Sequence, residues 1–564
     1  MGSQSVDTVT TQVVGNLLKT IADEVEVAMI RTSYSPVIKE SFDCSAGILG
    51  ANAEYWGQAD AIPLQVAVLS SVLAKTLETI PLSSLDPGDI LITNDPVVGA
   101  PHLNDFIALA PVFSGNTVIA FVATLMHHTD VGGKTPGSMP ADATELFQEG
   151  FRVPTRKLVR DGEFDLPLID LLLANTRTPK NLHGDLYAQV AATQLGVRRL
   201  EETVSRFGAQ RLIEAITAYL DYTEQLVRLA IREVLKPGTY TASRPIEDPS
   251  LIPDRDPIAM IVADVEVGEA SVTVDFSRST DQVRLPINVV ESNGVAVSLI
   301  ALRCMIGRDI PSNGGLQRVL KVVTRKGSIM NPVLPAPVGA RALAAAIAYD
   351  AVLECLAQAA PARAIATSSG GTTMPFTWMP TSGQGRILVD NSLTGGCGAR
   401  SDGDGLSAVD NAVTNAMNYP AEVMEQEHPV VVQRHEQRRA SGGPGRYRGG
   451  LGLRREVRLL ESGVLSVRGY RHRAGPPGLL GGLPGEPTRF WLERDGQEVP
   501  VAPQASGIPT RAGDVFVAET PGGGGLGVPS EREPDAVASD VKLGIETADG
   551  ALARYGIDVR PGRA

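Results

Sequence analysis

The sequence has few cysteines, few aromatic residues and no excess of positive charge. Its four cysteines lie far apart along 564 residues and form no CxxC pair. We therefore expect reduced thiols and exclude a zinc knuckle or a disulfide framework. Aromatic residues make up only 5% of the chain, which argues against a stacking platform for single-stranded nucleic acid. The formal net charge of -13 would repel nucleic acid and anionic membranes, so neither is an expected partner.

Targeting and nucleotide-binding signals are also missing. The N-terminus has no basic segment leading into an apolar core, as a signal peptide requires. No run of about 18 apolar residues predicts a membrane-spanning helix, so we expect a soluble, cytoplasmic protein. The glycine-rich segment 520–527 lacks the lysine and hydroxyl residue of a P-loop. We interpret it, and the glycine-rich segment 441–450, as tight turns. A reaction that needs ATP would need another chain to supply the ATP site.

Hydrophobic periodicity divides the chain into three regions of a mixed α/β (α+β) fold. In residues 1–240, apolar side chains at every fourth position from Val9 to Met29 predict an amphipathic helix capped by Asp7 or Thr8. The same region contains predicted helices over 64–79, 186–209 and 210–234, and strands over 89–93, 107–113 and 117–126. A proline-rich segment over 241–257, predicted to be a linker or a rigid crossing strap, precedes an α/β region over 258–400. That region has strands over 258–265 and 270–276 and helices over 294–306 and 340–358. Residues 401–564, rich in glycine and arginine, predict short strands and turns. We expect the regions to interlock.

Two short stretches place histidine close to aspartate. Three of the seven histidines lie in Pro101-His-Leu-Asn-Asp105 and Met126-His-His-Thr-Asp130. Neutral imidazole and carboxylate are the ligands that a divalent transition metal prefers. Both stretches lie at the ends of predicted strands, on loops that a rigid scaffold can hold. A metal there could provide hydroxide at neutral pH, so the stretches favour a metal-dependent enzyme over the alternative that each histidine only forms hydrogen bonds.

The chain resembles the hydantoinase B family over nearly all of its length. This family comprises the second subunit of ATP-dependent N-methylhydantoinases and the corresponding half of 5-oxoprolinase, and the alpha subunit of acetone carboxylase is a relative. The resemblance rests on a series of motifs in the same order: Arg31-Thr-Ser-Tyr-Ser-Pro36 with Glu40 and Asp43, Gly88-Asp-Ile-Leu-Ile-Thr-Asn-Asp-Pro96, His102 and Asp105, His127-His-Thr-Asp-Val-Gly-Gly133, Pro136 to Met139, Glu149-Gly150, Gly395 to Arg400, Asn415 to Glu425, Ser441-Gly-Gly443 and Pro521-Gly-Gly523.

The resemblance implies one divalent metal, zinc or manganese, held by Asp43, His102, Asp105 and a histidine of the 127/128 pair. It favours His127 as the ligand. Side chains alternate between the two faces of a strand, so His127 would share a face with Phe121, Ala123 and Leu125, and His128 with Val122, Thr124 and Met126. His128 would then form a hydrogen bond nearby or meet the substrate. We expect Asp130 to orient a ligand or to act as general base.

The resemblance also implies a hetero-oligomer with a hydantoinase A-type subunit that carries ATP and magnesium. The partner would phosphorylate the carbonyl oxygen of a cyclic amide, and metal-bound water on the present chain would attack the activated carbon. Two departures lie near the expected site: Ala100-Pro101 replaces the usual Gly-Gly, and Gln65 stands where a histidine is common. Two alternatives stay open, an acetone-carboxylase-like ATP-dependent carboxylase subunit and a non-catalytic scaffold for the ATPase subunit. Metal content separates the scaffold from both enzymes.

Overall fold

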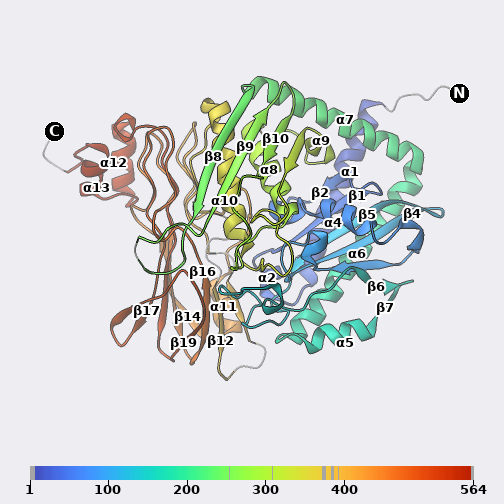
Figure 1. The fold of residues 1–564 in the computed structure, drawn as a ribbon, viewed down its shortest axis with the longest axis horizontal. Helices are drawn as coiled ribbons and strands as arrows, with labels where there is room; N and C mark the ends of the chain where they lie inside the picture. The colour runs from blue at the N-terminus through green and yellow to red at the C-terminus, as the bar shows by residue number, and fades with distance from the viewer. Residues whose placement is uncertain are drawn as a thin grey trace.

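The computed structural model describes residues 7–252, 254–307, 309–370, 376–382, 386–390 and 393–560. Residue 253, within the expected linker, lies outside the described residues. Figure 1 shows three parts side by side: the N-terminal sheet with its helices, a smaller sheet with two central helices, and the C-terminal strands. The fold is mixed α/β, as the sequence predicts.

The N-terminal part is built on a seven-stranded antiparallel sheet with the order β2-β1-β5-β4-β3-β6-β7. The strands predicted over 89–93, 107–113 and 117–126 are β3, β4 and β5. Strand β4 begins earlier than predicted, at Asp105, and β5 extends to His127, so both residues belong to the sheet itself. The strands are β1 (Cys44–Gly50), β2 (Tyr55–Gln58), β3 (Ile90–Thr93), β4 (Asp105–Ser114), β5 (Thr117–His127), β6 (Arg156–Arg160) and β7 (Glu163–Phe164).

Helices cover both faces of this sheet. Helix α1 (Thr8–Thr32) begins at Asp7, whose side chain accepts the N–H of Thr10 and confirms the predicted cap. Helices α1 and α6 (Pro179–Phe207) pack on one face, and α7 (Ala209–Val234) follows α6 after a single residue. The helix predicted over 64–79 is interrupted and forms α3 (Pro63–Val66) and α4 (Leu69–Leu77) on the other face. Short helices α2 (Pro36–Lys39) and α5 (Leu166–Ala174) complete this part.

The middle part has a four-stranded sheet with the order β11-β10-β9-β8. The proline-rich segment over 241–257 begins inside strand β8, which pairs with β9 along its whole length. The central helices α8 and α10 pack against each other and share one hydrophobic core with α4 and the N-terminal sheet. The first two regions therefore fold as one body. The elements are β8 (Gly238–Ile246), β9 (Ala259–Val267), β10 (Val272–Asp275), α8 (Glu291–Ile306), α9 (Gly314–Gln317), β11 (Leu320–Val323) and α10 (Arg341–Ala359).

Helix α10 is long and apolar enough to cross a membrane by length and composition alone, although Asp350 and Glu354 interrupt its apolar run. However, 83% of its apolar window is buried inside the protein. Its packing against α8, β8 and β9 is that of a core helix, whose circumference is largely apolar because every side is covered.

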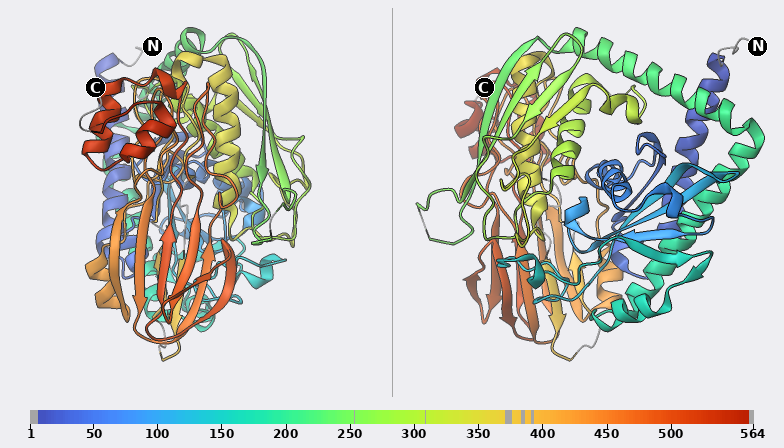
Figure 2. Two further views of the ribbon diagram at one scale, coloured as in Figure 1. Left: turned by 90° about the vertical axis from the view of Figure 1, so that its left-hand side faces the viewer. Right: turned by 45° about the vertical axis from the view of Figure 1, so that its right-hand side comes forward.

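The C-terminal part is a sandwich of two antiparallel sheets around one apolar core. Figure 2 shows its strands below the red helices α12 and α13. The first sheet has the order β13-β12-β16-β19 and the second β14-β15-β20-β17-β18. The elements are β12 (Phe376–Pro380), β13 (Leu388–Asp390), α11 (Ala421–Glu427), β14 (Val430–Gln437), β15 (Leu453–Leu459), β16 (Gly463–Arg468), β17 (Arg489–Arg494), β18 (Gln497–Pro500), β19 (Gln504–Thr510), β20 (Val515–Glu519), α12 (Pro534–Lys542) and α13 (Ala548–Tyr555).

The prediction of tight turns in the glycine-rich segments is wrong for most of their glycines. Apart from Gly527, whose φ is 72°, no glycine in 441–450 or 520–527 has a positive φ. Gly523 instead donates its N–H to the carbonyl of Gly450, 2.9 Å away, in a bundle of extended segments from distant parts of the chain. A Cβ atom on Gly523 would lie 1.9 Å from the carbonyl oxygen of Cys397. Glycine is required here because backbones touch, whereas turns would require it for its φ angle.

Candidate metal site

Adjacent strands bring three of the predicted ligands to one corner of the N-terminal sheet. Asp43 directly precedes β1, His127 ends β5 and Asp105 begins β4, and these strands are neighbours in the order β1-β5-β4. Asp105 is the direct cross-strand partner of His127, and the N–H of His127 donates to the carbonyl of Asp43 at 3.1 Å. Residues directly opposite each other in antiparallel strands project from the same face. The side chains of these residues therefore lie close together at one face of the sheet.

His102 joins this group from the loop before β4. Its Nδ1 lies 3.3 Å from Oδ2 of Asp105 without forming a hydrogen bond. The Nδ1 of His127 lies 3.1 Å from Oδ1 of Asp105 and 3.9 Å from Oδ2 of Asp43. The two imidazole rings meet edge to face, with centroids 4.8 Å apart. All four side chains are buried.

These atoms could serve as ligands of one divalent ion. Metal–ligand distances near 2.1 Å place neighbouring ligand atoms about 3.0–3.5 Å apart, and the contacts around Asp105 match that spacing. Ligand atoms of His102, Asp105 and His127 all lie within 4.8 Å of one another. Burial, with Arg341 nearby, holds the pKa of His102 well below its usual value. The ring is therefore neutral, the form that binds a metal. The buried Nδ1 of His102 and Nε2 of His127 have no hydrogen-bond partner.

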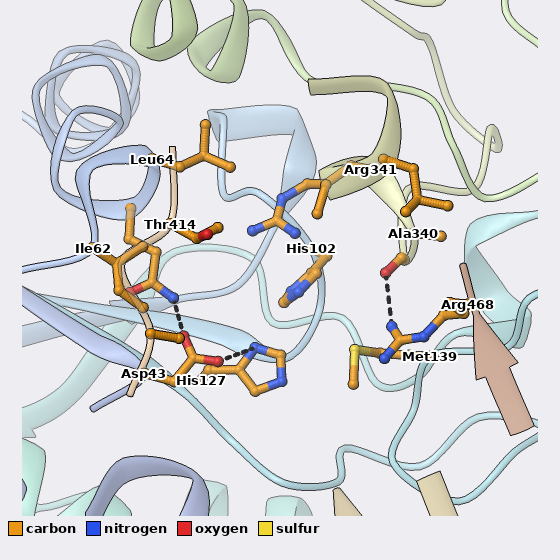
Figure 3. A pocket seen from close by; sticks show the side chains of 15 residues that line it. Asp43, Ile62, Leu64, His102, His127, Met139, Ala340, Arg341, Thr414 and Arg468 are labelled. Carbon is orange, nitrogen blue, oxygen red and sulfur yellow. Dashed lines mark hydrogen bonds and ion pairs between the residues drawn. The ribbon is translucent and has the colours of Figure 1, made fainter. Parts of the chain in front are cut away.

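The cluster opens into a small cavity of about 60 Å³ (Figure 3). Its polar lining residues are Asp43, Gln65, His102, His127, Thr414, Arg341 and Arg468, and its apolar lining residues include Ile62, Leu64, Met139 and Leu343. Arg341 begins α10 and Arg468 ends β16. The site therefore extends beyond residues 1–240, since all three parts of the fold contribute to it.

Three polar residues that the sequence motifs did not single out as ligands support the cluster. The Nε2 of Gln65 donates to Oδ1 of Asp43 at 2.5 Å, and Nη2 of Arg341 donates to Oδ2 of Asp105 at 2.9 Å. The buried Asn94 donates to the carbonyl of Leu103 and so holds the loop that carries His102. Of the two departures from the family pattern, Gln65 lines the cavity, and Ala100-Pro101 does not.

His128 lies on the opposite face of β5, as strand alternation predicts. Phe121 and Leu125 pack into the core around α8 and α10, whereas Val122 and Met126 pack against α1. The ring of His128 meets Phe106 edge to face at 4.9 Å and does not line the cavity. Burial lowers its pKa to about 3, so it is neutral. Its surroundings are those of a core residue, and it has no route to a substrate in this cavity.

Asp130 also lies outside the cavity lining. Its carboxylate accepts the N–H groups of Gly132 and Gly137, each at 3.0 Å, and the guanidinium of Arg177 at 2.9 Å. These contacts fix the loop that follows β5. Because its oxygens are occupied by fixed donors, Asp130 is suited to holding this loop, and the structure does not bring it to the cluster.

The comparisons with known proteins agree with the motifs in the sequence. A sequence profile described as hydantoinase B/oxoprolinase matches residues 7–529. The B-type subunit of a putative D-/L-hydantoinase of Pseudomonas sp. is 31% identical, over 99% of this chain and 96% of its own. The crystal structure of an ATP-dependent caprolactamase from Pseudomonas jessenii superposes with a TM-score of 0.92 at 27% identity, over 100% of this chain and 98% of that one.

An acetone carboxylase has the same fold, with a TM-score of 0.87 at 19% identity, over 98% of this chain and 79% of its own. The sequence profile, the hydantoinase relative and the caprolactamase structure all extend over most of the chain. The chain therefore belongs to the hydantoinase B/oxoprolinase family.

Proposed function

We propose that this chain is the metal-dependent hydrolytic subunit of an ATP-dependent cyclic amidohydrolase, which opens a hydantoin, 5-oxoproline or a similar lactam. The observation that carries the proposal is the buried cluster of His102, His127, Asp105 and Asp43 at a cavity lined by both polar and apolar side chains. The polar side chains suit a reacting amide, and the apolar side chains suit the methylene groups of a ring. The similarity to an ATP-dependent caprolactamase, an enzyme named for a lactam, supports it.

Zinc or manganese bound to these residues would lower the pKa of a water molecule to about 7 and polarise a carbonyl oxygen. Contacts with neighbouring side chains fix the positions of the expected ligands. Asp105 lies between the two imidazole rings and is fixed by Arg341. Gln65 orients Asp43. The surrounding apolar side chains exclude bulk water, which strengthens every electrostatic interaction in the cavity.

A hydantoinase A-type partner would supply the ATP site, because this sequence contains no phosphate-binding motif. An unstrained lactam is a poor electrophile, and phosphorylation of its carbonyl oxygen activates the adjacent carbon. The net reaction takes up two water molecules, one to open the ring and one to release phosphate. We expect a hetero-oligomer in which the phosphorylated lactam reaches the cavity of the present chain.

Reconstitution tests this proposal. The purified chain alone should hydrolyse neither ATP nor lactam, and addition of a hydantoinase A-type protein should give ATP-dependent ring opening that His127→Ala abolishes. Consumption of acetone and bicarbonate in place of a lactam would identify the carboxylase alternative. If His127→Ala left ring opening intact, the chain would be a scaffold for its partner. ATP hydrolysis by the isolated chain would contradict the assignment of ATP to the partner.

A further inference from the structure

Arg468 is a second buried arginine that lines the cavity, and it comes from the C-terminal part of the fold. Arg468 ends β16 in the C-terminal sandwich, yet its side chain lines the cavity formed mainly by the N-terminal sheet and α10. Figure 3 shows His102 between the side chains of Arg341 and Arg468. Arg468 is only 3% exposed, so its charge is removed from water.

Within the part of the chain that the structure describes, Arg468 has no carboxylate partner, although a buried guanidinium normally has one. Arg341 forms an ion pair with Asp105 at 2.9 Å. Among the described residues, the single hydrogen bond of the Arg468 side chain runs from Nη1 to the carbonyl of Gly339 at 3.5 Å, and its buried Nη2 has no partner. A hydrogen bond of that length is weak, and an uncompensated buried charge is strongly unfavourable.

The carboxyl group of Glu149 is close enough to affect the pKa of Arg468, although the described side chains of the two residues do not form an ion pair. Its two oxygens accept the N–H groups of Val338 and Gly339, at 3.1 and 2.7 Å. Burial raises the pKa of Glu149 to about 8, so this group is largely protonated at neutral pH. The protonated carboxyl group therefore does not neutralise the charge of Arg468. A bound anion would neutralise it.

The charges of the cavity also favour an anion. The carboxylates of Asp43 and Asp105 balance the guanidiniums of Arg341 and Arg468, so a divalent ion would leave an excess of two positive charges. Arg341 also has a donor, its buried Nε, that has no hydrogen-bond partner among the described residues. A guanidinium presents two parallel N–H groups that match two oxygens of a phosphate.

We propose that Arg468, together with Arg341, forms an oxyanion subsite that takes the phosphoryl group of the phosphorylated lactam. The inference rests on the proposed function, since a partner must supply that phosphorylated substrate. Apolar side chains of the lining would contact the ring, while the guanidiniums hold the phosphoryl oxygens beside the His/Asp cluster. A phosphoryl group placed there would be held at fixed donors in a site that excludes water. In this proposal Arg468 binds the phosphoryl group, and the metal ligands serve the attack of water on the activated carbon.

Calorimetric titration of the full chain, as purified with its metal, tests the subsite with inorganic phosphate and, separately, with acetate. Wild type should bind phosphate in preference to acetate. Arg468→Met should weaken phosphate binding about ten- to a hundred-fold, the loss expected for charge-assisted hydrogen bonds. Arg468→Lys should fall between the two, because it keeps the charge and loses the paired donors. Arg458→Met, on the exposed side of β15, is the control and should bind phosphate as wild type does.

A crystal of the wild-type protein soaked in tungstate gives a second test that does not depend on the folding of a variant. The anomalous peak should place a tungstate whose oxygens lie at hydrogen-bond distance from the guanidinium of Arg468. Equal phosphate affinity in Arg468→Met, no phosphate binding by wild type, preference for acetate, or a tungstate peak elsewhere would each overturn the subsite. These measurements need neither partner nor ATP, so their failure is distinguishable from a failure of lactam hydrolysis in the reconstituted complex.

Discussion

Replacing His127 or His128 by alanine separates metal binding from core packing. The two residues are adjacent in sequence but project from opposite faces of β5. His127 contacts Asp105 and Asp43, whereas His128 packs against Phe106. We expect His127→Ala to lose metal and His128→Ala to retain it, since only the first removes a nitrogen from the cluster.

The expected magnitudes follow from these surroundings. Loss of a residue that merely orients a ligand costs 10- to 100-fold in metal affinity, so loss of His127 should cost at least about 100-fold, or about 2.7 kcal/mol. Removal of the His128 ring leaves a void beside Phe106, and such truncations cost about 2–4 kcal/mol of stability. Gln189 is a polar neighbour of the buried His128 ring, so the full cost of about 2–4 kcal/mol is expected.

Elemental analysis after dialysis, a competitive chelator titration and urea unfolding measure these effects on the same preparations. His127→Ala should have little bound metal. His128→Ala should bind metal as wild type does and unfold at lower urea concentration. Loss of metal only in His128→Ala would refute the ligand assignment and the strand register on which it depends.

Three further changes test other parts of the structure. Gln65→Leu removes the 2.5 Å hydrogen bond to Asp43 and should weaken metal binding about 10- to 100-fold in a chelator titration; unchanged affinity would show that Gln65 does not orient this carboxylate. Gly523→Ala should destabilise the chain by more than about 3 kcal/mol in urea unfolding, because the new Cβ would overlap a carbonyl oxygen. Its control, Gly294→Ala inside α8 with no contact closer than 3.7 Å, should be neutral or stabilising. Burial raises the pKa of Glu26 from 4.5 to about 7, so its ionisation destabilises the folded chain as pH rises through that range. Glu26→Gln should therefore raise the thermal midpoint at pH 8 and change it little at pH 4.5, and an equal effect at both pH values would contradict the shift.

The sequence predicted the long helices and the central strands β3, β4 and β5 because their signals are local, and it did not predict β1, β2, β6, β7 or α5. Apolar periodicity located α1, α6 and α7, although α6 begins earlier than predicted, at Pro179, and alternation placed His127 and His128 on opposite faces of β5. The glycine segments were misinterpreted because the same composition serves turns and close backbone packing. Their actual requirement, contact between segments such as 396–398, 449–450 and 522–523, depends on the tertiary fold and leaves no local signal.

The residues of the candidate site could likewise be predicted only where their signal is local. The ligand motifs are short and could be recognised, whereas Arg341 and Arg468 reach the cavity from α10 and β16, more than 200 residues further along the chain. Nothing in the sequence around either arginine distinguishes it from an arginine on the surface. Asp130 was selected because it follows the histidine pair closely, and the structure shows that its oxygens hold the next loop instead.

The central claim is that His102, His127, Asp105 and Asp43 bind one divalent metal, and metal content tests it most directly. Elemental analysis of the purified wild-type chain should give about one zinc or manganese ion per chain. His102→Ala, purified in the same way, should contain far less. Equal metal content in the two proteins, or no metal in either, would contradict the account.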